Sequence, residues 1–229
     1  MKAHIAHVLQ SIHGQNRQKQ NELHVRTLQA HNVQLERAIR DKEREVESLK
    51  HQVANLEARV QEMMGTDSLT GLPNRHVFKE HLTHSLKRAL RLGYSLSLML
   101  IDIDHLREIN LKYGYEVGDL VLIEVAAILK SSVREIDMPA RWGGEELVTV
   151  LHETDAEGAA VVAERIRRKV SSLEIKDPHT GRLIKVTCTL AVSSYPSHSH
   201  EAHGLLESAG EALVAAKDSG CNAVVIAVR

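Results

Sequence analysis

A seven-residue repeat of apolar side chains runs from Val25 to Met63 and restricts this part of the chain to a long helix. β-Branched residues at the first position of the repeat and leucine at the fourth favour a parallel two-stranded coiled coil. We therefore predict that residues 1–64 form an N-terminal helix that dimerises as a parallel coiled coil, rather than one solvated helix. Glu45 of one helix and Lys50 of the partner helix lie at positions of the repeat where they can form an ion pair. The first positions are Val25, Asn32, Ile39, Val46, Val53 and Val60, and the fourth positions are Leu28, Leu35, Lys42, Leu49, Leu56 and Met63.

The second part, residues 65–229, contains a clear turn in the segment RWGGEEL at positions 141–147. A two-residue hairpin turn needs positive φ at its central positions, which glycine adopts without steric cost. We expect the two glycines to form this turn and to lift Glu145 and Glu146 to an exposed rim, where adjacent carboxylates can bind a metal ion. Taken alone, the segment also fits a solvated acidic turn.

An apolar run from Ser95 to Asp102 predicts a buried strand that ends in Asp102-Ile103-Asp104. Side chains alternate along a strand, so the two aspartates point the same way and the Ile103 carbonyl lies between them. Hard oxygen ligands favour Mg²⁺ or Mn²⁺, and Mg²⁺ is usually held by one or two carboxylates together with substrate phosphates. Asp102 and Glu145 would suffice for such a site. Turn capping is an equally good interpretation of the two aspartates by themselves.

Four motifs in order make the chain resemble the GGDEF family of diguanylate cyclases. They are the entry segment TDSLTGLPNR at 66–75, the Asp-x-Asp at the strand end, the segment REINLKYGYEVGD at 107–119 and the Gly-Gly-Glu-Glu hairpin. The resemblance spans about residue 66 to Arg229, and the glutamate form of the hairpin is a common family variant. It implies an enzyme that condenses two GTP molecules, one from each of two domains, into cyclic di-GMP and pyrophosphate.

The resemblance also implies roles for the acidic residues. Asp102, the carbonyl of Ile103 and Glu145 would hold Mg²⁺ or Mn²⁺. Glu145 is the candidate for deprotonating the attacking 3′-hydroxyl, Glu146 would support the metal site, and Arg107 would lie near the phosphates. Phosphoryl transfer needs positioning and charge neutralisation more than covalent help, which suits these groups.

Substrate-binding roles follow from the same resemblance. Asn110 and Asp119 match the guanine-reading pair, because a carboxylate facing the guanine N1–H and amino group gives selectivity through hydrogen bonds. Tyr115 falls within the same segment, and Lys217 matches a phosphate-binding lysine.

A product-inhibition site is implied by a third set of residues. Arg134 and Asp137 match the family's Arg-x-x-Asp pair, and Arg165 falls where a second inhibitory arginine often stands. The planar fork of arginine suits guanine and phosphate edges. An Arg-x-x-Asp pair alone is weak evidence, since ion pairs three residues apart are common on helices.

Several positions depart from the family pattern. Leu111 and Tyr115 replace aspartate and histidine, while Thr189-Leu190-Ala191 replaces Ser-Ile-Gly, a change that we expect to concern packing. Without an arginine at position 221, one charge-assisted contact to the triphosphate is lost, and weaker GTP binding is the resulting hypothesis. The C-terminal departures are Gly210, Val214 and Cys221, where aspartate, tyrosine and arginine are usual.

Composition indicates a cytoplasmic protein that does not span a membrane and does not bind nucleic acid. The 29 basic and 30 acidic residues nearly cancel, so no overall field attracts nucleic acid. The sequence has no apolar run long enough to span a bilayer and no signal-peptide pattern. Two cysteines, Cys188 and Cys221, are too few for a disulfide framework.

The order of elements predicts an α+β fold with a palm-like, mostly antiparallel central sheet wrapped by helices and preceded by the coiled-coil helix. Helices are expected at 75–92, 117–132, 156–172 and 201–218. Strands are expected at 95–103, at 138–151 as a hairpin, on both sides of a turn near 179–181, and at 222–228.

Three functions are compatible with these features. The first is an active diguanylate cyclase that is inhibited by its product. The second is a degenerate domain that binds GTP or cyclic di-GMP and signals through its coiled coil without significant turnover. The third is a coiled-coil scaffold with no nucleotide role. It is the least favoured of the three functions, because a scaffold has no use for converging carboxylates at a hairpin tip.

Overall fold

The computed structural model describes residues 34, 37, 39–53, 56, 60 and 64–228, and the chain divides between Ala58 and Arg59 into two units. Residues 39–53 are α-helical, as the heptad pattern predicts. The remaining heptad positions at Val25, Leu28, Asn32, Leu35 and Met63 lie outside the described residues.

The apolar heptad positions of this helix face solvent in the single chain. Ile39, Val46, Leu49, Val53, Leu56 and Val60 are each between 50% and 58% exposed. Lys42 pairs with Glu45 on its own helix, and Lys50 pairs with Glu47. A helix with one exposed apolar stripe needs a partner surface to bury it, so dimerisation through this stripe stays a prediction.

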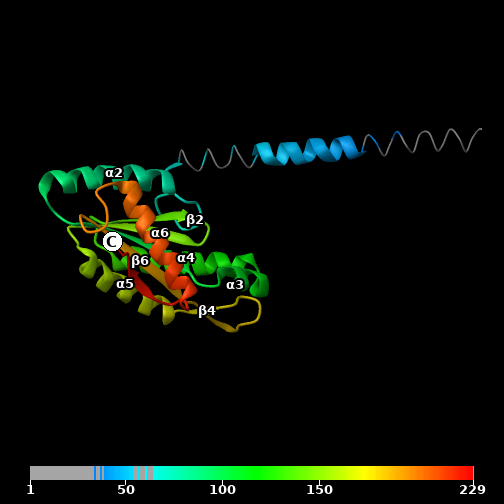
Figure 1. Cartoon of the computed structure of the whole chain (residues 1–229). Helices are drawn as coiled ribbons and strands as arrows, with labels where there is room; N and C mark the ends of the chain where they lie inside the picture. Colours follow the sequence, from blue (N-terminus) through cyan, green and yellow to red (C-terminus); the bar gives the residue numbers. More distant parts are fainter. Residues whose placement is uncertain are drawn as a thin grey trace, which may run out of the picture. The chain divides into compact units, whose positions relative to one another are not determined.

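The second unit is built on a five-stranded mixed sheet with the strand order β2-β3-β1-β6-β7 (Figure 1). Four of its strands pair antiparallel, and β7 runs parallel to β6, so the sheet is mostly antiparallel as expected. A separate two-stranded hairpin is formed by β4 and β5. The strands are β1 (Leu96–Ile103), β2 (Met138–Gly143), β3 (Glu146–His152), β4 (Glu174–Lys176), β5 (Leu183–Lys185), β6 (Cys188–Tyr195) and β7 (Val224–Ile226).

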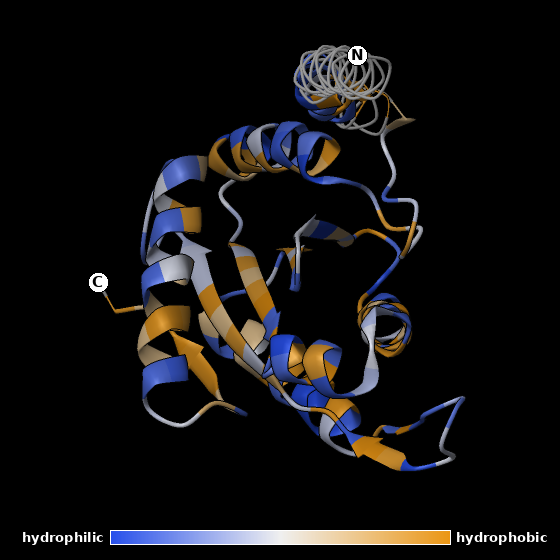
Figure 2. Ribbon diagram, turned by 90° about the vertical axis from the view of Figure 1, so that its right-hand side faces the viewer, coloured by the Kyte–Doolittle hydropathy of each residue, from blue (hydrophilic) through white to orange (hydrophobic). Residues whose placement is uncertain are grey.

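Helices cover both faces of this sheet. In Figure 2 the central strands are coloured mainly from white to orange, whereas the surrounding helices alternate between hydrophilic and hydrophobic residues. We find no helix among the described residues that is long and apolar enough to cross a membrane. The helices are α2 (Arg75–Leu92), α3 (Leu106–Tyr113), α4 (Tyr115–Ser132), α5 (Ala156–Ser171) and α6 (Ala202–Asp218).

Alternation along β1 divides the core into two layers. Met99, Ile101 and Ile103 pack with α3, α4 and α5, whereas the residues between them pack with α2 and α6. Because side chains two apart share a face, Asp102 belongs to the α2 and α6 side. The end of the buried strand therefore presents its carboxylate toward α6.

Local sequence sets the ends of the first helix of the domain. The side chain of Asn74 accepts a hydrogen bond from the Val77 amide and caps the N-terminus of α2, while Gly93 ends the helix with φ 73. Asparagine is a favoured N-cap, and glycine is the usual residue for a left-handed C-terminal cap. The predicted bounds of this helix are confirmed.

The helix α3 was not among the expected elements. It is short, and only Leu106 and Ile109 of it are buried, so its apolar period is too brief to be recognised. The residue before it, His105, has φ 57, an uncommon value for a residue other than glycine. The chain thus turns sharply between the end of β1 and α3.

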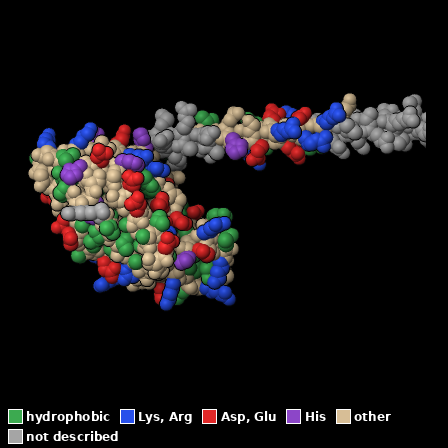
Figure 3. All heavy atoms as spheres, viewed as in Figure 1, with side chains coloured by type: hydrophobic (Ala, Val, Ile, Leu, Met, Phe, Trp, Pro, Cys, Tyr) green, Lys and Arg blue, Asp and Glu red, His purple; other side chains and the backbone are tan. Residues whose placement is uncertain are grey.

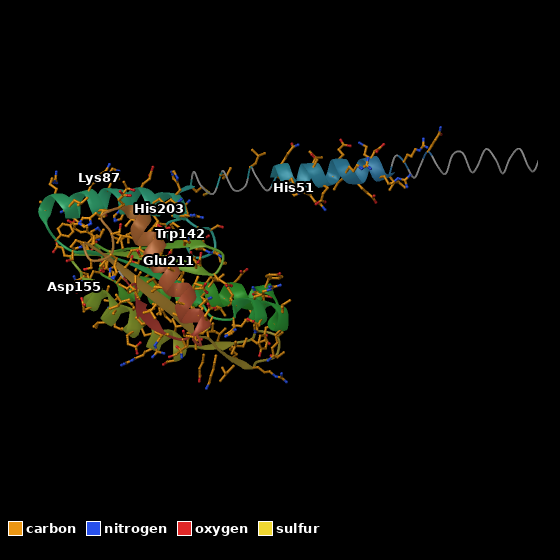
Figure 4. All side chains as sticks on the ribbon, in the orientation of Figure 1. His51, Lys87, Trp142, Asp155, His203 and Glu211 are labelled. Atoms are coloured by element: carbon orange, nitrogen blue, oxygen red, sulfur yellow. The ribbon has the colours of Figure 1, made fainter. Side chains whose placement is uncertain are left out.

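The substitution Gly210→Ala is expected to stabilise the domain by about 0.5–1 kcal/mol, because glycine in a helix interior costs that much relative to alanine. Gly210 precedes Glu211 on α6 (Figure 4), and a methyl group there would meet nothing within 4 Å. Thermal unfolding followed by circular dichroism should show a rise of a few degrees. Gly158→Ala is the matched control, since its methyl group would meet Asp155 at 3.0 Å. An equal gain in both variants would refute the steric argument.

Candidate active site

The acidic hairpin has a different turn from the one that we expected. Gly144 and Glu145 form the turn, and Gly143 pairs with Glu146 as the last residue of β2. The register shifts between Arg141 and Gly143, where Gly143 has φ 151, and Gly144 has φ 52. The prediction of a turn centred on both glycines was therefore wrong by one residue, because the register shift leaves Trp142 without a register partner in β3 and pairs Gly143 with Glu146 inside the strand.

Arg141 holds this turn in place. Its guanidinium donates to the Gly144 carbonyl at 2.8 Å and to both carboxylate oxygens of Asp67 at 3.0 and 3.1 Å. Burial alone would raise the pKa of Asp67, but hydrogen bonds from Thr70 and Arg141 hold that pKa below its ordinary value. One guanidinium nitrogen, Nη1, makes both contacts to Asp67, while Nε and Nη2 face the Gly144 carbonyl, so the charge-assisted bonds of a single arginine link the two segments. Sequence reasoning missed this link, because the two residues lie far apart in the chain.

The acidic residues of the strand end and the hairpin lie side by side. Asp102 is the register partner of Glu146, and the Ile103 amide donates to the Glu145 carbonyl at 3.3 Å. Burial, reinforced by the neighbouring charge of Asp102, raises the pKa values of Glu145 and Glu146. Burial also raises the pKa of Asp102. Carboxylates that disfavour one another's ionisation mark a place that suits a cation.

Lys217 supplies positive charge to this acidic group. Its Nζ lies 2.5 Å from Asp102 Oδ1, and the two side chains are 28% and 11% exposed. Burial alone would lower the pKa of Lys217, but the Asp102 carboxylate raises it overall. The lysine was predicted to bind phosphate, and its pairing with Asp102 is a finding that the sequence did not indicate.

The donor set fits a hard cation only in part. Within the part of the chain that the structure describes, no three carboxylate, imidazole or thiolate groups converge to hold a metal ion. Mg²⁺ ordinarily needs only one or two carboxylates together with waters and substrate phosphates. Asp102 and Glu145, with the carbonyl of Ile103, are compatible with that mode of binding, and the metal site stays a prediction.

The second aspartate of the strand end has a structural role. Asp104 is 3% exposed, and its carboxylate accepts hydrogen bonds from Thr187, Thr189 and the Asn222 amide. Asp104 thus makes structural hydrogen bonds to residues far along the chain rather than to the turn that follows its own strand. The Thr189 hydroxyl takes part in this network, and a serine would offer the same hydroxyl, so the expectation that the change at this position concerns packing stays a prediction.

The predicted guanine-binding residues gather where α3 meets α4. A methyl group built on Gly118 would lie 1.8 Å from Asn110 Oδ1, so the amide of Asn110 sits directly against the glycine. That Oδ1 is buried and has no hydrogen-bond partner among the described residues. Tyr115, Gly118 and Asp119 share one face of α4, because residues three and four apart are neighbours on a helix. Tyr115 and Asp119 are exposed.

Arg107 lies exposed in the first turn of α3. The charge of its neighbour Glu108 contributes to the raised pKa of Glu145, so this turn lies near the hairpin. Backbone N–H groups at a helix N-terminus favour anions. The place is suitable for the predicted phosphate contact of Arg107.

The predicted inhibitory residues line one cavity of about 480 Å³. Arg134 is exposed there, and Arg165 donates to the Ser132 carbonyl at 2.6 Å. Asp137 accepts from the backbone amides of Arg134 and His152 at 2.9 and 3.0 Å. Burial would raise the pKa of Asp137, but its bonds to His152 and Arg134 lower it overall. The structure thus brings together two residues of the loop between α4 and β2 and one residue of α5.

The departures from the family pattern lie around the same acidic edge and α3–α4 region. Leu111 and Tyr115 are each 78% exposed, so neither side chain joins the core. Val214 is exposed on α6, and Cys221 follows that helix with φ 59.

Acidic and basic side chains are interspersed over the domain in Figure 3, in keeping with the near-zero net charge.

Comparison of the sequence with known proteins finds close relatives. The chain is 42% identical over 164 residues to the response regulator PleD of Caulobacter vibrioides, covering 72% of this chain and 36% of that protein. It is 40% identical over 169 residues to diguanylate cyclase A of Treponema denticola, covering 72% of this chain and 45% of that protein. The chain thus spans less than half the length of these relatives.

Solved structures show the same fold. The GGDEF domain of DgcB from Caulobacter crescentus, in complex with c-di-GMP, matches with a TM-score of 0.69 and 32% identity, over 72% of this chain and 94% of that one. The diguanylate cyclase SiaD from Pseudomonas aeruginosa, in complex with its activator SiaC, matches with a TM-score of 0.67 and 30% identity, over 97% of this chain and 83% of that one.

An α+β fold of this topology, with a Gly-Gly-Glu-Glu hairpin beside the end of its central strand, defines the class of GGDEF domains. The sequence profile described as "Diguanylate cyclase, GGDEF domain" matches residues 64–223. The chain belongs to this family.

Proposed function

We propose that the protein is a diguanylate cyclase that condenses two GTP molecules into cyclic di-GMP and pyrophosphate across a dimer. One observation carries the proposal. Asp102 and Glu146 are neighbours across the sheet, Glu145 stands beside them in the turn, and Lys217 contacts Asp102. Such an arrangement suits a divalent cation and a triphosphate, and relatives that include named diguanylate cyclases support the assignment.

In the proposed reaction, the 3′-hydroxyl oxygen of one GTP forms a bond to the α-phosphorus of the other. The bond from that phosphorus to the bridging oxygen breaks, and pyrophosphate leaves. Glu145 takes the hydroxyl proton, and the second bond forms in the same way. Mg²⁺ or Mn²⁺, held by Asp102, Glu145 and the Ile103 carbonyl, would neutralise charge on the phosphates.

Substrate recognition is assigned to the groups around this edge. Asn110 and Asp119 would bind the guanine edge, with Tyr115 beside them on α4. Arg107 and Lys217 would contact the phosphates, and Glu146 would support the metal site. Lys217 would then exchange its bond with Asp102 for one with a phosphate oxygen when the nucleotide enters.

The reaction needs two domains face to face, and the N-terminal helix provides a means to supply the second. Linking two domains raises the effective concentration of each for the other, often to the millimolar range. The exposed apolar stripe of residues 39–60 supports dimerisation through a parallel coiled coil. We further propose that a partner protein supplies the input signal, since the SiaD chain, which matches 97% of this chain and is itself covered to 83%, was solved in complex with an activator.

The direct test is incubation of the purified protein with GTP and Mg²⁺, followed by chromatographic separation of the nucleotides. The proposal expects cyclic di-GMP and pyrophosphate, and it expects no product with ATP alone. Bound cyclic di-GMP should first be removed, because product inhibition would mask turnover. Absence of product at high GTP would favour the alternative of a domain that binds GTP or cyclic di-GMP without significant turnover. The replacements at Leu111, Tyr115 and Cys221 support that alternative.

Product inhibition should weaken about tenfold in Arg134→Ala, because a charge-assisted hydrogen bond to the ligand is lost. We expect cyclic di-GMP to bind the 480 Å³ cavity lined by Arg134, Asp137 and Arg165. The measurement is the cyclic di-GMP concentration that halves the initial rate. Arg182→Ala, on an exposed residue outside this cavity, is the control. Unchanged inhibition in Arg134→Ala would remove the cavity from consideration.

A further inference from the structure

The buried carboxylate of Asp104 joins three separate segments of the domain. Oδ1 accepts from Thr189 Oγ1 at 2.7 Å, and Oδ2 accepts from Thr187 Oγ1 at 2.8 Å and from the Asn222 amide at 2.9 Å. Its own amide donates to the Thr187 carbonyl at 2.9 Å. Because these three donors occupy both oxygens and the group is 3% exposed, Asp104 is poorly placed to bind substrate or metal.

The loop that it holds, between α6 and β7, has an unusual backbone. Gly220, Cys221 and Asn222 all have positive φ, at 126, 59 and 45. Cysteine and asparagine pay a conformational cost in this region, so such a run persists only where surrounding contacts fix it. The contact from Asn222 to Asp104 is one of them, and the bond from the Leu190 amide to the Ala223 carbonyl is another.

The same loop continues directly from Lys217. The Lys217 carbonyl accepts from the Gly220 amide at 3.2 Å and from Cys221 Sγ at 3.7 Å. The Lys217 side chain contacts Asp102, two residues before Asp104. The end of β1 is thus joined to the end of α6 at two points, one through the lysine side chain and one through the loop that follows it.

We infer that Asp104 is a positioning residue that sets the place of Lys217 for the triphosphate of GTP, by fixing the loop after α6. The inference rests on the proposed function, in which Lys217 contacts phosphate. Asp104 does not touch the substrate. Instead, Asp104 holds the last turn of α6 close to Asp102. From there Lys217 can give up its contact with the Asp102 carboxylate and bind a phosphate oxygen. The loop carries Cys221 where the family usually has a phosphate-binding arginine. Lys217 therefore contributes a larger share of the binding of the phosphates.

A double-mutant cycle between Asp104→Asn and Lys217→Ala tests this inference. We expect Asp104→Asn alone to raise the KM for GTP about tenfold, the effect of losing one charge-assisted contact. In the Lys217→Ala background the same change should raise KM less than twofold, since the residue through which it acts is absent. If the fold-change in KM of the double variant equals the product of the fold-changes of the two single variants, the inference is overturned. A merely structural role of Asp104 would not depend on Lys217.

Two further variants keep the test decisive. If Asp104→Asn does not fold, as judged by circular dichroism, Thr189→Val takes its place, since it removes one donor to the carboxylate and leaves Asp104 present. Asp218→Asn, on the exposed last residue of α6, is the control and should leave KM unchanged. If the wild type makes no product, the proposed turnover fails, and the same cycle is measured with GTP dissociation constants from calorimetry. A double variant whose binding free energy differs from the sum of the single changes would then still support the positioning role, and an additive one would reject it.

Discussion

Replacing Glu145 by glutamine is expected to lower the rate of cyclic di-GMP synthesis by about two to four orders of magnitude. A positioned general base contributes about 10²–10⁴ to a rate, and glutamine cannot accept the 3′-hydroxyl proton. The substitution keeps the size of the side chain and its place in the turn beside Gly144. Initial rates with GTP and Mg²⁺, measured by chromatography, give the comparison.

Two controls separate chemistry from folding in this experiment. Glu135→Gln makes the same chemical change at an exposed glutamate in the loop between α4 and β2 and should keep the wild-type initial rate. The melting temperature of Glu145→Gln should stay within a few degrees of that of the wild type, because the turn is held by Arg141 rather than by this side chain. A Glu145→Gln rate within tenfold of the wild type would mean that another group takes the proton.

The sequence predicted the fold where apolar periods are long or turn residues are specific. The bounds of α2 follow from Asn74 and Gly93, and the mostly antiparallel sheet follows from the order of its strands. The helix α3 was missed because two buried residues do not make a recognisable period. The hairpin turn was misplaced by one residue, since the register shift at Trp142 is decided by pairing between strands rather than by glycine preference alone.

The candidate site was predicted less completely than the fold, for a physical reason. Motifs within one segment, such as Glu145 and Glu146, are visible to local reasoning. The ion pairs of Lys217 with Asp102 and of Arg141 with Asp67 join residues far apart in the chain. Only the packing of α6 on the sheet, and of the entry segment on the hairpin, brings these partners together. Their existence is a property of the fold, and no spacing in the sequence announces it.

The second large effect is expected from Gly118→Ala, which should raise the KM for GTP between about 10- and 100-fold. The new methyl group would lie 1.8 Å from Asn110 Oδ1 and 2.9 Å from its Cγ, so the amide must move. Loss of one or two hydrogen bonds to a buried guanine edge costs about that factor. Alanine has the higher helix propensity, so a general loss of stability is not the expected cause.

Coupling to Asn110 distinguishes this steric explanation from others. In an Asn110→Ala background the amide is already absent, so Gly118→Ala should change KM less than twofold. Gly210→Ala is the matched control, because its methyl group meets nothing within 4 Å and should leave KM unchanged. If Gly118→Ala alone keeps the wild-type KM, then Asn110 does not bind guanine from its position against Gly118. The assignment of guanine recognition to Asn110 and Asp119 at the junction of α3 and α4 would then have to be abandoned.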